Sequence, residues 1–160
     1  MFDRFNDAAR HSIVLANKVA AFERSEDIRP EHLFCGLLLQ RGSLAVAVLV
    51  SFGLDLEAAI SRATSDMPAT FAPSPGRRVF HKKTKEALER SVRAADERAH
   101  AHVGTEHLLL GVVAASSPRR LRKRLGVPLP DDGALSARIA ELTSGETYPD
   151  DLMWASKPPT

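Results

Sequence analysis

The chain has 160 residues, of which 44% are hydrophobic and 26% are charged; this excludes a large multidomain machine but suffices to bury a core. No apolar run approaches the roughly 20 residues that cross a bilayer, and the polar first turn lacks the plan of a secretory signal, so we expect a cytoplasmic protein without a membrane partner. The 22 Lys and Arg residues nearly balance 20 Asp and Glu residues, and the formal charge of +2 does not by itself indicate nucleic-acid binding.

The first part of the chain has the pattern of four helices. Apolar residues recur every three or four positions over residues 3–23, which is typical of one buried helical face. A second helix is expected to begin near Pro30, because proline is tolerated at the first helical position. Glycines then separate two segments, 43–52 and 54–66, that are each apolar on one side. Residues 1–66 are therefore predicted to form a four-helix unit.

A second copy of this unit follows after a shift of 75 residues without a gap. The shift superposes identical residues, namely Phe5 on Phe80, Ala20 on Ala95, Glu31 on Glu106, His32 on His107, Leu33 on Leu108 and Gly36 on Gly111. Helices are expected at residues 82–99, 105–115, 118–125 and 131–143, and no stretch alternates like a strand. The sequence predicts an all-α fold of eight helices in two pseudo-symmetric four-helix repeats, 1–66 and 80–145.

Two segments fall outside the repeats. Residues 67–79 contain three prolines and a glycine, whose backbone preferences oppose helix and strand, and are predicted to be a linker. Residues 146–160 form a tail with little periodicity, which contains the only tyrosine and the only tryptophan, Tyr148 and Trp154. The tail is either a solvated end or a segment that docks on the body.

The repeated pairs Glu31-His32 and Glu106-His107 lie at predicted helix starts, where the helix dipole favours negative charge. In one interpretation the glutamate serves the dipole and the histidine packs at the helix start. In the other the glutamate binds a guanidinium while nearby donors hold an attached anion. Spacing alone leaves both open.

Catalytic and metal chemistry are not indicated. Four potential ligands crowd into copy two, at His100, His102, Glu106 and His107, but copy one lacks partners for its own pair and no zinc-protease spacing occurs. The single cysteine, Cys35, excludes an internal disulfide and a cysteine-based zinc cluster. Phosphate-binding loops and nucleophile elbows are absent from the sequence. We therefore expect a protein that is not an enzyme and needs no cofactor or metal.

Five cations crowd into the six residues from Arg119 to Arg124, whereas the corresponding residues 44–49 of copy one are apolar. Such a cluster is compatible with nucleic-acid binding, with a solvated face or with an acidic protein partner. Because no aromatic residue interrupts the run, nucleic acid is an unlikely partner.

The double repeat resembles the N-terminal repeat domain of the Clp-type AAA+ unfoldases, most closely the ClpC branch. The resemblance rests on Phe2-Asp3-Arg4-Phe5, on Glu31-His32-Leu33 and on the motif Gly104-Thr105-Glu106-His107-Leu108-Leu109-Leu110-Gly111, and covers about residues 1–145. It implies an eight-helix fold that receives substrates and adaptors ahead of ATPase rings; since no ATPase module follows, we expect a stand-alone domain.

In ClpC-type members this domain binds phosphorylated arginine at two equivalent pockets. The resemblance assigns the carboxylates to Glu31 and Glu106, and copy two is expected to be better equipped because it keeps Thr105 and has Lys83 where an arginine is usual. His81 replaces a usual threonine there. Copy one departs further, with Arg29-Pro30, Ala8 and Asn6 at the matching positions.

The resemblance implies a second surface, a groove between the first helices of the two copies, which binds cyclic peptide antibiotics in actinobacterial relatives. The matching residues here are Phe2, Arg10, Val14, Asn17, Phe80, Lys85 and Glu89. Their mixture of apolar and charged side chains suits a peptide. The alternative is that both phenylalanines pack the interface between the repeats.

The leading hypothesis is a non-catalytic, monomeric binding module that recognises phosphoarginine-marked or peptide ligands. Its expected partners are Clp unfoldase or protease components, or their substrates and adaptors, in protein quality control. The alternatives are a decoy that sequesters cyclic peptide antibiotics and a nucleic-acid-binding accessory that uses the basic run.

Overall fold

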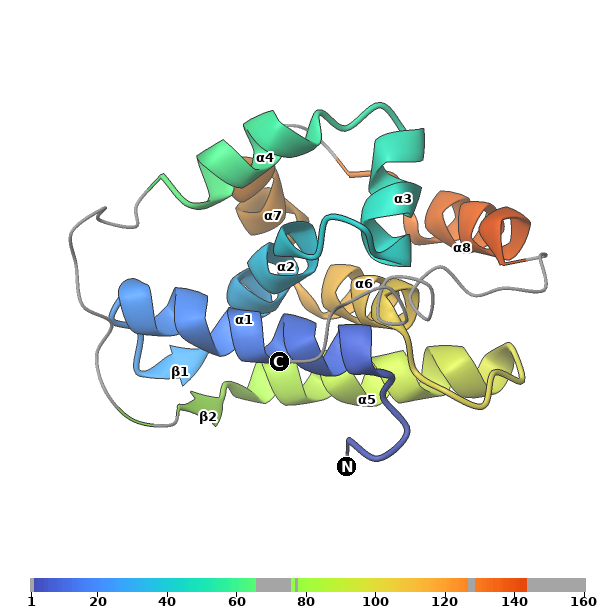
Figure 1. Ribbon diagram of the computed structural model, residues 1–160, viewed down its shortest axis with the longest axis horizontal. Helices are drawn as coiled ribbons and strands as arrows, with labels where there is room; N and C mark the ends of the chain where they lie inside the picture. The colour runs from blue at the N-terminus through green and yellow to red at the C-terminus, as the bar shows by residue number, and fades with distance from the viewer. Residues whose placement is uncertain (1, 66–75, 77, 127–128, 144–160) are drawn as a thin grey trace.

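The computed structural model describes residues 2–65, 76, 78–126 and 129–143. Within these residues lie eight helices and two short strands (Figure 1). In chain order the elements are α1 (Asp7–Phe22), β1 (Asp27–Ile28), α2 (Pro30–Leu39), α3 (Leu44–Ser51), α4 (Leu56–Ala63), β2 (Val79–Phe80), α5 (Lys82–Glu97), α6 (Thr105–Ala115), α7 (Pro118–Leu125) and α8 (Asp132–Leu142). The predicted all-α fold of eight helices in two repeats is confirmed.

Short polar side chains fix where several helices begin. Asn6, Ser43, Asp55 and Asp131 each accept a hydrogen bond from the backbone N–H three residues further on, which satisfies a donor that the helix leaves unpaired. The cap at Asn6 explains why α1 begins at Asp7 and not at residue 3 as predicted. Residues 3 and 4 form a turn instead, in which the N–H of Phe5 donates to the carbonyl oxygen of Phe2 at 3.0 Å.

The two repeats are joined by exchanged backbone pairs. Phe5 pairs in parallel with Val103 in an isolated bridge, and Ile28 in β1 pairs in parallel with Phe80 in β2. A shift of 75 residues superposes Phe5 on Phe80 and Ile28 on Val103. In each repeat, the segment before the first helix therefore pairs with the other repeat. The expectation of no strand is wrong for these two-residue elements, which are too short to show alternation.

Each repeat packs its first two helices in close contact through a glycine. A Cβ at Gly36 in α2 would lie 2.2 Å from the carbonyl oxygen of Ser12 in α1, and a Cβ at Gly111 in α6 would lie 2.2 Å from that of Ala87 in α5. Glycine has a low helix propensity. At these two positions, however, its lack of a side chain lets the two helix backbones approach more closely than any other residue would allow.

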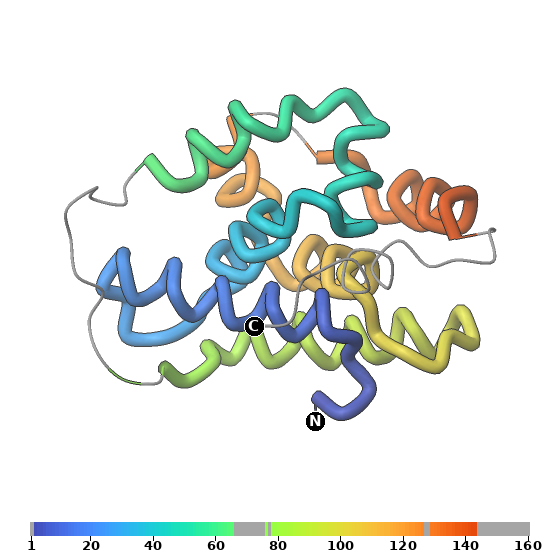
Figure 2. The backbone as a smooth tube through the Cα atoms, in the orientation of Figure 1, coloured from blue at the N-terminus to red at the C-terminus, as the bar shows by residue number. Residues whose placement is uncertain are grey.

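The second helices of the two repeats form the centre of the molecule. α1 packs on α2, α5 packs on α6, and α2 and α6 contact each other, while α3, α4, α7 and α8 lie on the other side of this pair (Figure 2). The fully buried side chains of the centre are Leu33, Phe34, Leu37, Leu38, Leu108 and Leu109. None of the described helices is by itself long and apolar enough to cross a membrane; α2 and α3 reach that length only together, across a bend of 91°.

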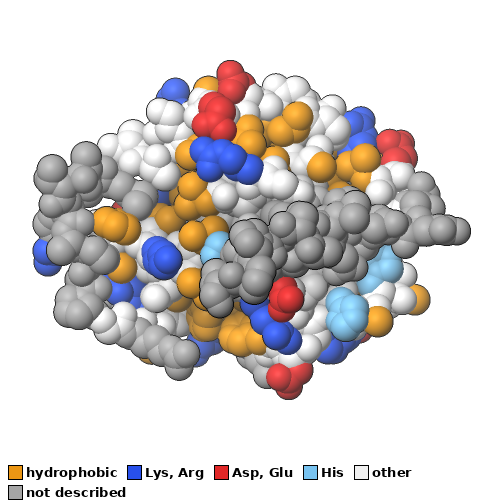
Figure 3. Space-filling view, in the orientation of Figure 1, with side chains coloured by type: hydrophobic (Ala, Val, Ile, Leu, Met, Phe, Trp, Pro, Cys, Tyr) orange, Lys and Arg blue, Asp and Glu red, His pale blue; other side chains and the backbone are white. Residues whose placement is uncertain are grey.

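Charged side chains of both signs are interspersed on the face shown in Figure 3, in keeping with the small net charge. Electrostatic recognition must therefore depend on a local cluster. Of the predicted linker, only residues 76, 78 and 79 are described, and the tail at 146–160, with Tyr148 and Trp154, lies outside the described residues.

Candidate functional site

A pocket of about 440 Å³ opens where three helices begin. The starts of α2, α5 and α7 converge there with the end of α6, so the positive ends of three helix dipoles and the negative end of a fourth border the same space. The lining residues are Arg29, Pro30, Glu31, His81, Lys83, Ala115, Ser116, Ser117 and Arg120.

The exchanged strands hold this convergence in place. The carbonyl oxygen of Ile28 accepts hydrogen bonds from the N–H of His81 at 3.0 Å and from Oγ1 of Thr84 at 2.6 Å. These bonds anchor the start of α5 directly beside the start of α2. Helix α7 begins at Pro118, whose fixed dihedral suits a first helical position.

Glu31 is the only carboxylate among the described residues that line the pocket, where it faces three cationic side chains. Its Oε1 lies 3.8 Å from Nη1 of Arg120, a loose ion pair in which the glutamate side chain is 15% exposed and the arginine 64%. Arg29 and Lys83 have further carboxylate contacts outside the pocket, to Asp27 and Glu86 at 3.1 and 3.3 Å. The pocket thus offers one acceptor for a cation and several donors for an anion.

One hydroxyl in the pocket has no partner. The Oγ atom of Ser116 is buried without a hydrogen bond, which is unfavourable for a polar atom. The lining therefore suits a ligand that carries a cationic and an anionic group close together.

The equivalent position in the second repeat is sealed. Thr105 and Glu106 have no exposed surface, and Thr105 Oγ1 accepts a hydrogen bond at 3.1 Å from the backbone N–H of Ala45 in α3. Both carboxylate oxygens of Glu106 lack a hydrogen-bond partner. Nδ1 of His107 lies 2.7 Å from one of them, but this nitrogen already accepts the N–H of Gly104 at 2.9 Å and has no proton to donate.

The predicted grouping of Glu106, Thr105 and Lys83 in one open pocket is wrong. Lys83 lies in the pocket with Glu31, because the exchanged strands place the start of α5 beside α2 of the other repeat. The first-repeat pocket, expected to be the poorer one, is the open one. Ala45 and Arg120 occupy equivalent positions in the repeat: the small residue packs over α6, whereas the long one borders a space beside α2.

The two histidines of the repeated pairs are structural. Nδ1 of His32 accepts the backbone N–H of Arg29, and Nδ1 of His107 accepts that of Gly104, each at 2.9 Å. Nε2 of His32 contacts Glu23, and Nε2 of His107 contacts Nδ1 of His100, again at 2.9 Å. Burial, followed by the neighbouring His107, lowers the pKa of His100. Among the described residues no group of three or more His, Cys, Asp or Glu side chains could hold a metal ion.

The predicted peptide groove is only partly assembled. The rings of Phe2 and Phe80 lie 6.0 Å apart, which places both at the contact between the repeats. Arg10 donates hydrogen bonds to the carbonyl oxygens of Phe2 and Asp3. Of the other predicted residues, Asn17 is half-buried, whereas Val14, Lys85 and Glu89 are exposed.

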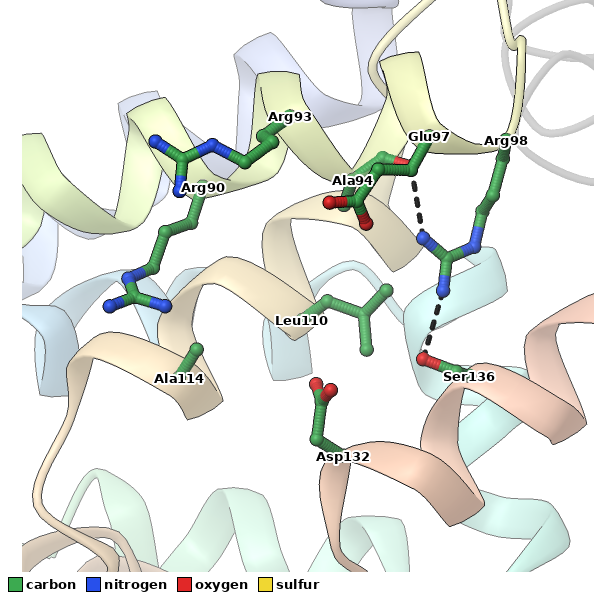
Figure 4. A pocket seen from close by; sticks show the side chains of 9 residues that line it. All are labelled: Arg90, Arg93, Ala94, Glu97, Arg98, Leu110, Ala114, Asp132 and Ser136. Atoms are coloured by element: carbon green, nitrogen blue, oxygen red, sulfur yellow. Dashed lines mark hydrogen bonds between the residues drawn. The ribbon is translucent and has the colours of Figure 1, made fainter.

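A second, smaller pocket of about 210 Å³ lies between α5, α6 and α8 (Figure 4). Arg98 closes one end by donating hydrogen bonds to the carbonyl oxygen of Ala94 and to Oγ of Ser136, both at 2.9 Å. Arg90 and Arg93 lie at the other end, on the same helix. Sequence reasoning missed this pocket, since its lining residues come from three distant helices and form no motif.

Sequence reasoning also missed the part that Arg29, Ser116, Ser117 and Arg120 play in the larger pocket. Arg120 was visible only as one cation in a basic run. The signal that could have located it is its equivalence with position 45, combined with the placement of the two repeats.

The chain belongs to the family of the Clp repeat (R) N-terminal domain, whose model matches residues 4–125. It is 30% identical over 138 residues to the negative regulator of genetic competence ClpC/MecB of Bacillus subtilis, covering 81% of this chain and 16% of that protein. It is 33% identical over 112 residues to an uncharacterized protein of Mycobacterium tuberculosis, covering 70% of this chain. The chain spans 44% of the length of that mycobacterial relative.

Solved structures share the fold. The N-terminal domain of the caseinolytic protease associated chaperone ClpD from Arabidopsis thaliana matches with a TM-score of 0.68 and 19% identity, over 91% of this chain and 97% of that one. A complex of the ClpV N-domain with a VipB peptide matches with a TM-score of 0.66 and 15% identity, over 87% and 86%. The resemblance to a ClpC-like Clp N-terminal domain is thereby confirmed.

Proposed function

We propose that this chain is a non-catalytic binding domain of a Clp protease system and that it recognises phosphorylated arginine in the pocket at the starts of α2, α5 and α7. The single observation that carries this proposal is Glu31, a carboxylate only 15% exposed that lines the same pocket as Lys83, Arg29 and Arg120. Family membership supports a role in binding substrates or adaptors. The peptide complex of a ClpV N-domain supports a peptide-like ligand.

Phosphoarginine matches the chemistry of this lining. Its planar guanidinium suits the carboxylate of Glu31, and its phosphoryl group suits the cationic side chains of the lining and the positive dipole ends of the helix starts. The loose contact between Glu31 and Arg120 is easily replaced, because Arg120 is mostly exposed and can turn toward the phosphoryl group. The carboxylate of Glu31 then binds the guanidinium, and the donors of the pocket bind the phosphoryl group.

Calorimetric titration of phosphoarginine tests the proposal. We expect Glu31→Gln and Lys83→Ala each to weaken binding by roughly 10- to 100-fold, as expected for a lost charge-assisted hydrogen bond. The matched control is Glu89→Gln, which removes an exposed carboxylate on α5 outside the pocket. Equal affinities for the wild type and Glu31→Gln would refute the assignment, and a loss confined to Glu89→Gln would move the site to the outer surface.

A second candidate is a peptide site on the outer surface of α1 and α5. Two observations favour it: Val14 is 49% exposed, and the half-buried rings of Phe2 and Phe80 lie 6.0 Å apart where the two repeats meet. A cyclic peptide would contact Val14 beside the charged Lys85 and Glu89, as the alternative of a peptide decoy requires. Val14→Asp should then abolish binding of such a peptide without affecting phosphoarginine, and unchanged peptide affinity would exclude this surface.

A further inference from the structure

We propose that the outer face of α7 binds acidic residues next to the modified residue in the pocket, so that the preferred ligand is an acidic segment of protein. This inference rests on the proposed function of the pocket. We define the basic face as Arg119, Arg122 and Lys123, which are all exposed.

The cations of α7 divide into two groups. Leu121 and Leu125 are buried, and Arg124 beside them is directed inward to Glu23, while Arg120 reaches Glu31 at the pocket. The three residues of the basic face form no ion pair with any described residue. Within the described part of the chain, no carboxylate neutralises these three charges.

One residue of the basic face, Arg119, opposes the stability of its own helix, whereas Arg122 and Lys123 lie in the last turn, where the helix dipole favours positive charge. Arg119 lies in the first turn of α7, where the helix dipole disfavours positive charge. Arg119 and Lys123 are four residues apart, and like charges at this spacing repel each other. The fold does not require these charges, because the equivalent helix α3 is apolar and largely buried. A role in binding accounts for Arg119, which the helix itself disfavours, and for a row of exposed cations that the equivalent helix does not have.

The basic face continues from the pocket. Arg120 lines the pocket, and Arg119 and Lys123 are its neighbours on the outer side of the same short helix. An extended chain advances about 3.3 Å per residue, whereas a helical turn rises about 5.4 Å. A peptide whose modified residue fills the pocket therefore brings the next few side chains over Arg119 and Lys123. Carboxylates at those positions would neutralise the basic face.

An acidic protein segment fits this surface better than nucleic acid does. No aromatic residue occurs in α7 to stack on bases. The carboxylate of Glu31 lies at the edge of the basic face and would repel a phosphate backbone, whereas it would accept the guanidinium of a modified arginine. A peptide that carries a modified arginine next to acidic residues would pair with both Glu31 and the basic face.

The test uses fluorescence anisotropy with short labelled peptides that contain one phosphoarginine flanked either by Asp and Glu or by Ser and Gly. Unphosphorylated versions of both peptides, free phosphoarginine as a competitor and a single-stranded DNA complete the set. The variant Arg119→Gln/Arg122→Gln/Lys123→Gln is compared with the matched control Lys18→Gln/Arg41→Gln/Arg93→Gln, which removes three exposed cations outside the basic face and outside both proposed binding sites.

We expect the wild type and the control to bind the acidic peptide about tenfold more tightly than the neutral one in dilute salt, with a smaller difference at high salt. The α7 variant should lose this preference and retain its affinity for free phosphoarginine. Equal affinities of the wild type for both peptides, or a preference that survives in the α7 variant, would overturn the inference. DNA binding that exceeds acidic-peptide binding and depends on the basic face would also overturn it.

Failure of the pocket can be recognised separately. If free phosphoarginine does not bind, the proposed function of the pocket is wrong. The unphosphorylated acidic and neutral peptides then still decide the inference, because a preference for the acidic peptide that requires the basic face supports it and the absence of such a preference refutes it.

Discussion

Glu23 at the end of α1 and Arg124 in α7 form an ion pair that joins the two repeats. Their side chains are only 15% and 18% exposed, and His32 contacts the second carboxylate oxygen of Glu23 at 2.9 Å. Burial alone would raise the pKa of Glu23, but hydrogen bonds from His32 and Arg124, together with their charges, outweigh it and lower the pKa below the ordinary value of 4.5.

We therefore expect acid to weaken the fold through Glu23. A carboxyl whose pKa is lower in the folded state contributes stability above its unfolded pKa, and this contribution is lost as the pH falls below about 4.5. Glu23→Gln should cost about 1–3 kcal/mol at pH 7, because Arg124 loses its partner. The free energy of unfolding of this variant should also depend less on pH in acid.

Urea unfolding between neutral and acidic pH measures both effects. Glu26→Gln is the matched control, since Glu26 is exposed on the following loop. If Glu23→Gln retains the acid dependence of the wild type, another group controls it.

Gly111→Ala should severely destabilise the second repeat. The added Cβ would lie 2.2 Å from the carbonyl oxygen of Ala87 and 2.4 Å from Oγ of Ser91, so α5 and α6 would have to move apart. We expect a loss of about 3 kcal/mol or more, seen as a lower Tm by circular dichroism. Gly133→Ala in α8 is the control, because its nearest neighbour would be at 3.4 Å and helix propensity favours alanine. Similar Tm values for the two variants would contradict the close packing.

Thr105 should contribute to stability and not to ligand binding. Thr105→Val removes the oxygen that accepts the N–H of Ala45 and leaves a buried donor unpaired, which should cost about 1–3 kcal/mol. Thr105→Ser keeps the oxygen and should restore most of this hydrogen bond. Phosphoarginine titration should give the wild-type affinity for both folded variants. A selective loss of binding in Thr105→Val would instead place Thr105 in a working pocket.

The fold was accessible from the sequence because its information is local and duplicated. Matches such as Gly36 with Gly111 occur at one constant spacing, and both glycines prove to make the same close contact in their repeats. The pairing between repeats was not accessible. Contacts such as that between Ile28 and Phe80 link segments far apart in the chain, and no local pattern distinguishes them from contacts within one repeat.

The site shows the same division between local and distant information. Glu31 and Glu106 have the same local sequence, Glu-His-Leu, so the sequence indicates both as candidates. One is open and the other is sealed because of residues that pack over them from another part of the chain, namely Arg120 and Ala45. Only the arrangement of the repeats shows which neighbour each glutamate receives.

Cys35 should be unreactive while the protein is folded. Its thiol is buried in α2, with Sγ 3.9 Å from the carbonyl oxygen of Ala63, and burial raises its pKa to about 11. Little thiolate then exists at pH 8, and the thiolate is the form that reacts with disulfide reagents. We expect no measurable reaction with Ellman's reagent in buffer and one equivalent of reaction in urea.

Gly111→Ala should react faster than Gly133→Ala in buffer, since unfolding exposes the thiol more often. Rapid modification of the native wild type at the rate of a free cysteine would show that α2 and α4 separate readily in solution.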